Sequence, residues 1–146
     1  MITLSQTFRI AVVVGAVTLT ACSSMMPSNT ATFGATLTGA AEVPAVITEG
    51  NGTLTATLNK TTGELTWKIT YTGLTGPATA AHFHGPAAAG ANAGVALGFA
   101  SAASPIEGKA TLTAAQVADL MAGKWYANVH TAANKGGEIR GQVAAK

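Results

Sequence analysis

The stretch Gly63-Glu64-Leu65-Thr66-Trp67-Lys68-Ile69-Thr70-Tyr71-Thr72-Gly73 decides the fold class of this 146-residue chain. Its apolar side chains, at positions 65, 67, 69 and 71, alternate with polar ones. Because successive side chains of a β-strand point to opposite faces, this period of two predicts a strand with one buried face and one face in water. We therefore expect an antiparallel sheet at the centre of the fold.

The same pattern continues outward from this stretch. Residues 52–58 alternate in the same way, and residues 59–63 fit a hairpin turn between the two strands. Residues 33–39 predict the first strand, and residues 95–99 predict a further short one. By periodicity, the chain is mostly strand.

One segment has the spacing of a helix instead. Apolar residues recur at helical intervals within residues 113–123, where Thr113 can cap the N-terminus and Gly123 can end the helix. The alanine- and glycine-rich residues 87–94 have little to bury and predict a loop. This loop is either a lid or a spacer.

The last predicted hairpin joins residues 125–130 to residues 139–143. Its large apolar side chains are expected to point inward, which leaves its polar side chains together on the outer face. The inward set is Trp125, Val129, Ile139 and Val143. A symmetric closure gives the cross-strand pairs His130 with Glu138, Asn128 with Arg140, and Tyr126 with Gln142. A slip of one residue would move each set to the other face.

All three histidines of the chain fall in two short motifs. His82 and His84 form an H-x-H pair in Ala81-His82-Phe83-His84-Gly85, and His130 lies in the last hairpin. On a strand, this spacing places both imidazoles on one face. Because Phe83 is expected to point into the core, we expect the histidines on polar faces rather than in the packed interior. The strand order decides whether His130 shares the face of the other two.

Three clustered imidazoles would form a metal site. Imidazole suits copper and zinc, and Cu(II) binds most tightly among the divalent first-row ions. Zinc held by three histidines and a water is the alternative. Glu138, Tyr126 and Arg140 are candidate additional ligands or residues that orient a histidine. The competing interpretation is that the histidines are solvated strand residues with hydrogen-bonding roles only.

The N-terminus has the features of an export signal. Arg9 precedes a short apolar run, and Leu19-Thr20-Ala21-Cys22 resembles a lipoprotein signal-peptidase site. The run is shorter than the roughly 20 residues of a membrane span, so residues 1–21 predict a cleaved lipoprotein signal peptide. Cys22, the only cysteine, is the predicted lipidation site, and residues 22–32 predict a flexible tether. The expected location is the cell envelope, with a lipid anchor in the outer membrane and the domain facing the periplasm.

The remaining residues, 33–146, are enough for one domain and too few for two. Removal of residues 1–21 removes Arg9, which lowers the formal net charge from +2 to +1. The few charged residues are not clustered, so the sequence has no nucleic-acid-binding footprint. It has no serine-nucleophile motif and no phosphate-binding loop, which favours binding over catalysis.

Four motifs together resemble one known family. They are Leu37-Thr38-Gly39-Ala40-Ala41-Glu42-Val43-Pro44-Ala45-Val46, Ala81-His82-Phe83-His84-Gly85-Pro86-Ala87, Trp125-Tyr126-Ala127-Asn128-Val129-His130-Thr131 and Gly136-Gly137-Glu138-Ile139-Arg140-Gly141-Gln142-Val143. In this order they resemble the CHRD domain, named after chordin, in which it repeats. Bacteria carry single secreted copies, so the chain resembles a single-domain bacterial lipoprotein of this family. The resemblance implies an all-β, immunoglobulin-like sandwich. With the helix, the expected fold is a Greek-key antiparallel β-sandwich with one short helix.

A weaker resemblance is local. The H-x-H-G segment with the distant Val129-His130 is similar to the copper-binding strands of copper/zinc superoxide dismutase, also a Greek-key sandwich. That enzyme uses further histidines and an aspartate. This chain has three histidines in all, and its one aspartate, Asp119, lies in the predicted helix. A complete dismutase site is therefore not expected.

The resulting prediction is an envelope lipoprotein that binds copper through His82, His84 and His130, for binding, storage or delivery rather than catalysis. One alternative is a metal-free module for protein or glycan contact. A second alternative is a copper-dependent redox enzyme of the dismutase type. A homodimer could supply extra ligands to the site.

Overall fold

The computed structural model describes residues 28–146. The predicted signal peptide, Cys22 and tether residues 22–27 lie outside the described residues. Over the described part, the elements are β1 Thr30–Thr38, η1 Gly39–Ala41, β2 Asn51–Asn59, β3 Glu64–Thr72, β4 Ala78–His84, β5 Val95–Gly98, β6 Ile106–Thr111, α1 Ala114–Met121, β7 Tyr126–Thr131, β8 Ile139–Gln142 and β9 Ala144–Ala145. Residues 30–32 of the predicted tether therefore already belong to β1. Within residues 28–146, no helix is long and apolar enough to cross a membrane.

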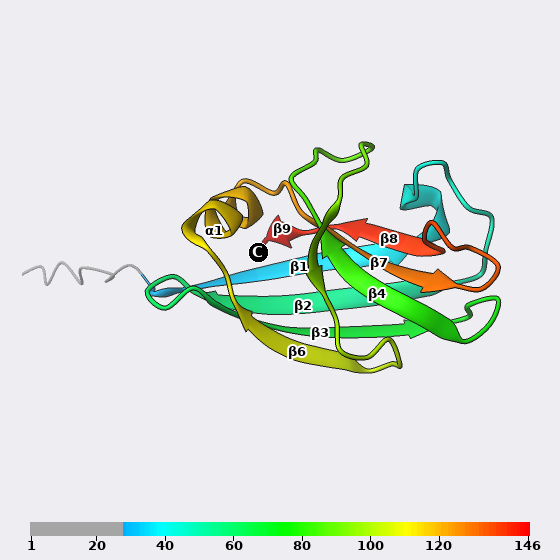
Figure 1. The fold of residues 1–146 in the computed structure, drawn as a ribbon, viewed down its shortest axis with the longest axis horizontal. Helices are drawn as coiled ribbons and strands as arrows, with labels where there is room; N and C mark the ends of the chain where they lie inside the picture. The colour runs from blue at the N-terminus through cyan, green and yellow to red at the C-terminus, as the bar shows by residue number, and fades with distance from the viewer. Residues whose placement is uncertain (1–27) are drawn as a thin grey trace, which may run out of the picture.

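The strands form one antiparallel sheet that curls on itself (Figure 1). Their order is β5-β4-β7-β8-β1-β2-β3-β6, and β9 pairs with β1. The half formed by β1, β2, β3 and β6 joins the half formed by β5, β4, β7 and β8 where Thr38 pairs with Arg140. The predicted all-β antiparallel fold with one short helix is confirmed. The two layers of the expected sandwich are the two halves of this curled sheet.

Aromatic side chains fill the core between the two halves. Trp67 of β3 meets Phe83 of β4 edge to face, with ring centroids 5.5 Å apart, and Phe99 contacts both rings. Trp125 packs against Phe83 at 5.6 Å. Burying one such side chain stabilises the fold by about 2–3 kcal/mol. Because Phe83 is fully buried, its neighbours on β4 must point to the opposite face of the sheet.

Local structure agrees with most of the sequence patterns. The hairpin of β2 and β3 forms as predicted, and residues 87–94 form a loop. Thr113 caps α1 through a capping box, and Gly123 follows the helix with φ of 68°. β6, at residues 106–111, was not predicted, because it has only one large apolar residue. Its Gly108 leaves the space that the Trp67 ring occupies.

The last hairpin has the predicted register but not the predicted surroundings. Tyr126 pairs with Gln142 and Asn128 with Arg140, and the ladder ends where Val129 meets Ile139. The expectation that its polar side chains face solvent is wrong, because every residue of β7 is buried. Three loops contact this face: residues 39–50 through Thr48 and Glu138, residues 85–94 through Asn92 and Arg140, and residues 132–137 through Lys135 and His130.

Hydrogen bonds show why a polar strand face can be covered. Arg140 donates to Asn92 Oδ1 at 2.9 Å and to the Ala91 carbonyl at 2.6 Å. Gln142 donates to the Ala87 carbonyl at 3.0 Å. Buried polar groups need partners, and the loop backbone supplies them in place of water. The loop at residues 87–94 is thus a lid over the polar face.

Candidate metal centre

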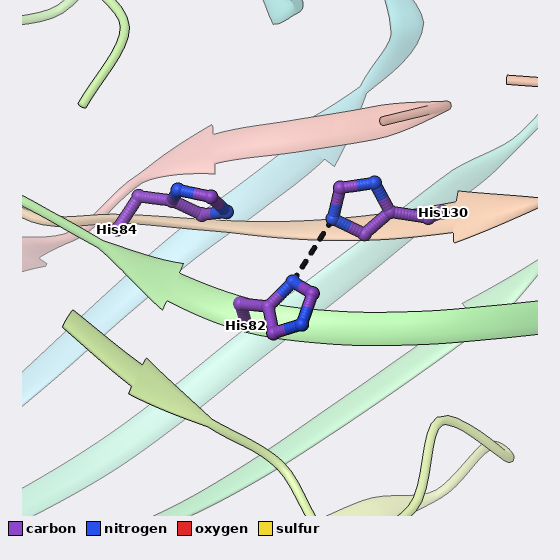
Figure 2. Close-up of side chains that lie close together, drawn as sticks. All are labelled: His82, His84 and His130. Atoms are coloured by element: carbon purple, nitrogen blue, oxygen red, sulfur yellow. Dashed lines mark hydrogen bonds between the residues drawn. The ribbon is translucent and has the colours of Figure 1, made fainter. Parts of the chain in front are cut away.

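β4 and β7 bring the three histidines together. The strands pair antiparallel, with Ala80 opposite His130 and His82 opposite Asn128, so the imidazoles share one face. Figure 2 shows them around a common space. One nitrogen of each ring lies within 4.8 Å of the others, and within the described part of the chain no Asp, Glu or Cys joins this group. Three imidazole nitrogens at this separation could hold a metal ion.

The centre is more enclosed than expected. His130 is 8% exposed, whereas His82 and His84 are half-buried. His130 lies on the polar face of the sheet, outside the hydrophobic core, as expected, but this face is covered at His130 rather than open to water. The reason is the lid and the turn at residues 132–137, which close over a face that strand alternation alone assigns to solvent.

Backbone carbonyls fix the tautomers of two histidines. His84 Nδ1 lies 2.9 Å from the Ala93 carbonyl, and His130 Nδ1 lies 3.0 Å from the Lys135 carbonyl. A carbonyl oxygen only accepts, so Nδ1 carries a proton in each ring, and in the neutral imidazole the lone pair is then on Nε2. The Nε2 of His84 is buried and has no hydrogen-bond partner within the described residues. Second-shell contacts of this kind are what orient metal-binding histidines.

His82 completes the group by a different contact. Its Nδ1 donates to His130 Nε2 at 3.1 Å, the dashed line in Figure 2. Burial, followed by the nearby His130 and His84, lowers the pKa of His82. Burial also lowers the pKa of His130, against the Lys135 carbonyl, which raises it. Neutral imidazoles are the forms that bind metal, so the lower pKa values favour binding.

Tyr126 and Arg140 lie beside the centre as a stack. The Tyr126 ring is parallel to His84, with centroids 4.8 Å apart and planes 2° from parallel. The Arg140 guanidinium lies 3.4 Å from the Tyr126 ring centroid. The Tyr126 hydroxyl donates to the Ala93 carbonyl at 3.3 Å, the same carbonyl that holds His84. The two residues thus form a stack on the His84 ring.

Glu138 lies apart from the histidines, in a cluster of threonines. Its carboxylate accepts hydrogen bonds from the hydroxyls of Thr131, Thr48 and Thr75 at 2.6–2.7 Å, and from the Thr75 backbone N–H at 2.8 Å. Burial raises the pKa of Glu138, but these hydrogen bonds outweigh it and lower the pKa to about 2. These contacts hold Glu138 in the threonine cluster, and among the described residues no carboxylate joins the three imidazoles.

Glu42 is a second buried acid on the covered face. It is 7% exposed, and its Oε1 has no hydrogen-bond partner within residues 28–146. Burial raises its pKa to about 7, although the positive charge of Arg140 and the Val43 backbone hydrogen bond lower it. Glu42 is therefore partly protonated near neutral pH. A Cβ at Gly137 would collide with it, so the glycine gives the carboxyl its space.

Sequence reasoning found the three histidines and Tyr126 but missed the groups that orient them. These are the carbonyls of Ala93 and Lys135. Any residue can supply a backbone carbonyl, so residue type carries no signal for it. The remaining signal was the loop at residues 87–94, whose composition says that it is irregular but not where it lies.

The fold and the site define a class: an all-β domain with a three-histidine centre under a loop. Residues 33–143 match the model of the CHRD domain family. The chain belongs to this family. Comparison with curated proteins gives no match, and comparison with solved structures gives none.

Proposed function

We propose that this protein binds copper through His82, His84 and His130 in the cell envelope, for storage or delivery. The observation that carries the proposal is the buried Nε2 of His84, which has no hydrogen-bond partner among residues 28–146 while its Nδ1 is held by the Ala93 carbonyl. An unpartnered buried acceptor costs about 1–3 kcal/mol, and an incoming metal removes that cost.

Copper is favoured over zinc by the donor set. Imidazole binds both ions, and the Irving–Williams order places Cu(II) above Zn(II). Catalysis is the lesser candidate, because no nucleophile motif accompanies the histidines. The proposed location rests on the N-terminal sequence: Cys22 would carry the lipid, and the domain would face the periplasm from the outer membrane.

The test is metal titration of the purified protein with copper and with zinc. The variant His82→Ala/His84→Ala/His130→Ala should lose binding of one copper ion per chain. Thr66→Ala, on the exposed face of β3, is the control and should keep it. Circular dichroism checks that each variant is folded.

Other outcomes would redirect the proposal. Equal binding by the wild type and the folded triple variant would contradict it and favour the metal-free interaction module. Superoxide consumption by the copper-loaded protein, lost in His82→Ala, would instead favour the redox enzyme.

A further inference from the structure

We propose that the centre is selective for monovalent copper, Cu(I), over Cu(II) and Zn(II). This inference rests on the proposed function and specifies the ion. It follows from two independent features: the neutral donor set and a buried positive charge beside it.

The donor set is uncharged. His84 and His130 carry their lone pairs on Nε2, and His130 Nε2 accepts a hydrogen bond from His82 Nδ1. A metal bound through His82 Nδ1 would replace this hydrogen bond, with the His82 proton moving to its Nε2, and the three imidazoles would stay neutral. No carboxylate or thiolate joins them within the described chain. Glu138 is occupied by three threonines and so is not available as an anionic ligand. Three neutral nitrogens complete a three-coordinate shell for Cu(I). Zn(II) and Cu(II) take at least a fourth ligand, which here would be a neutral water, so the protein supplies no negative charge against their second charge.

The positive charge belongs to Arg140. Its side chain is 2% exposed, and within the described residues no carboxylate forms an ion pair with it, the only ion pair being Lys68 with Glu107. Arginine remains charged at every physiological pH. Its guanidinium lies over the Tyr126 ring, and Tyr126 stacks on His84. A fixed positive charge is therefore separated from His84 by one aromatic ring.

This charge acts more strongly on a dication than on a monocation. The stacking distances of 3.4 Å and 4.8 Å keep the guanidinium within about 8 Å of the His84 ring centre. A unit charge at about this distance, at an effective dielectric constant of about 20, changes ion binding by on the order of tenfold per unit of ion charge. Arg140 therefore disfavours Cu(II) and Zn(II) relative to Cu(I). Glu42 is the acid whose pKa the charge of Arg140 lowers. Burial nevertheless raises the pKa of Glu42 to about 7, so Glu42 is only partly ionised near neutral pH and compensates the positive charge of Arg140 only in part.

The experiment is anaerobic competition titration of the purified protein with Cu(I), Cu(II) and Zn(II), each against a chelator of known affinity. Tighter binding of Cu(I) than of either dication supports the inference. The bound copper should then have a higher reduction potential than the aqueous ion. Tighter binding of Cu(II) or Zn(II) than of Cu(I) would overturn the inference while leaving a metal-binding function intact. Absence of binding by all three would instead contradict the proposed function.

Two variants isolate the charge. Arg140→Gln should narrow the ratio of Cu(I) to Cu(II) affinity by about tenfold, whereas Arg140→Lys, which retains the charge, should keep it. A purely structural role for Arg140 would lower both affinities together and leave the ratio unchanged. If neither Arg140 variant folds, Glu42→Gln at pH 8 tests the same inference. Loss of the negative charge of Glu42 should widen the ratio of Cu(I) to Cu(II) affinity. An unchanged or narrower ratio there would count against a role for the buried charge.

Discussion

Single side chains on the covered face show how burial can move the pKa of a carboxyl group in either direction. Glu138 and Glu42 are both buried glutamates. Hydroxyl donors surround the first, and its pKa is about 2, whereas Oε1 of the second has no donor within the described residues, and its pKa is about 7. The difference comes from hydrogen bonding to the charged form, because burial alone raises both.

Glu138 should stabilise the protein only when it is ionised. Its folded pKa lies below the ordinary value of 4.5, so its contribution is present above pH 4.5 and is lost as the pH falls toward 2. Glu138→Gln should lower the free energy of unfolding by about 3 kcal/mol at pH 7 and by much less near pH 2. Urea denaturation at several pH values measures this. Glu64→Gln, on the exposed side of β3, is the control, and an equally small effect in both variants would contradict the prediction.

Glu42 should have the opposite pH dependence. Its folded pKa lies above 4.5, so it costs stability as the pH rises from 4.5 through 7. Glu42→Gln cannot ionise, and its advantage over the wild type should grow by about 3 kcal/mol across this range. Parallel stability curves for the two proteins would show that Glu42 is ionised without penalty.

At this scale, sequence reasoning succeeded where alternation decides the outcome. His82 and His84 flank Phe83, so the burial of Phe83 sends both histidines to the other face. It failed for His130 and for Glu138, whose burial depends on loops that cover a strand face from far along the chain. Nothing in a polar strand residue shows whether water or a loop will satisfy it.

Among the strands, the contact between β1 and β8, where the two sheet halves meet, depends on one glycine. A Cβ at Gly141 of β8 would collide with the Thr36 carbonyl of β1. Gly141→Ala should therefore push β8 from β1 and destabilise the fold by about 1–3 kcal/mol. Gly76→Ala is the matched control, since nothing lies within 4 Å of its added carbon. Thermal melts of the two variants test this, and equal melting temperatures would rule out a close-packed contact between β1 and β8.

Elements with strong periodicity were predictable, and those defined by a partner were not. β3 alternates large apolar and polar residues and was predicted within a residue of its bounds. β6 pairs with β3, but its own sequence has only one large apolar residue, so it shows no alternation from which a strand could be predicted. The β7–β8 register could be predicted because a symmetric closure of the hairpin points the large apolar side chains of both strands to the same face.

For the whole molecule, the hydrophobic core and the metal centre are separate. The aromatic cluster of Trp67, Phe83 and Phe99 lies between the sheet halves, whereas the histidines lie on the other face of β4 and β7. The metal-free protein should therefore be folded. A metal in 100-fold excess over its dissociation constant should add about 2.7 kcal/mol to the free energy of unfolding.

Melting curves with copper, with a chelator and with neither measure this linkage. The chelated protein should melt cooperatively at a lower temperature than the copper-loaded one. The His82→Ala/His84→Ala/His130→Ala variant should show no copper-dependent rise. Unfolding by the chelator alone would mean that the metal is part of the core rather than an addition to it.

The three imidazoles are not held equally firmly, and this affects how fast a bound metal ion can pass to an acceptor. Backbone carbonyls hold His84 and His130, whereas His82 is hydrogen-bonded to His130 itself. Two immobile donors would retain an ion while the third swings aside, so a ligand from an acceptor could enter before the ion is free. Release would then be an exchange rather than a dissociation. We expect off-rates to rise with acceptor concentration even where equilibrium affinity is high.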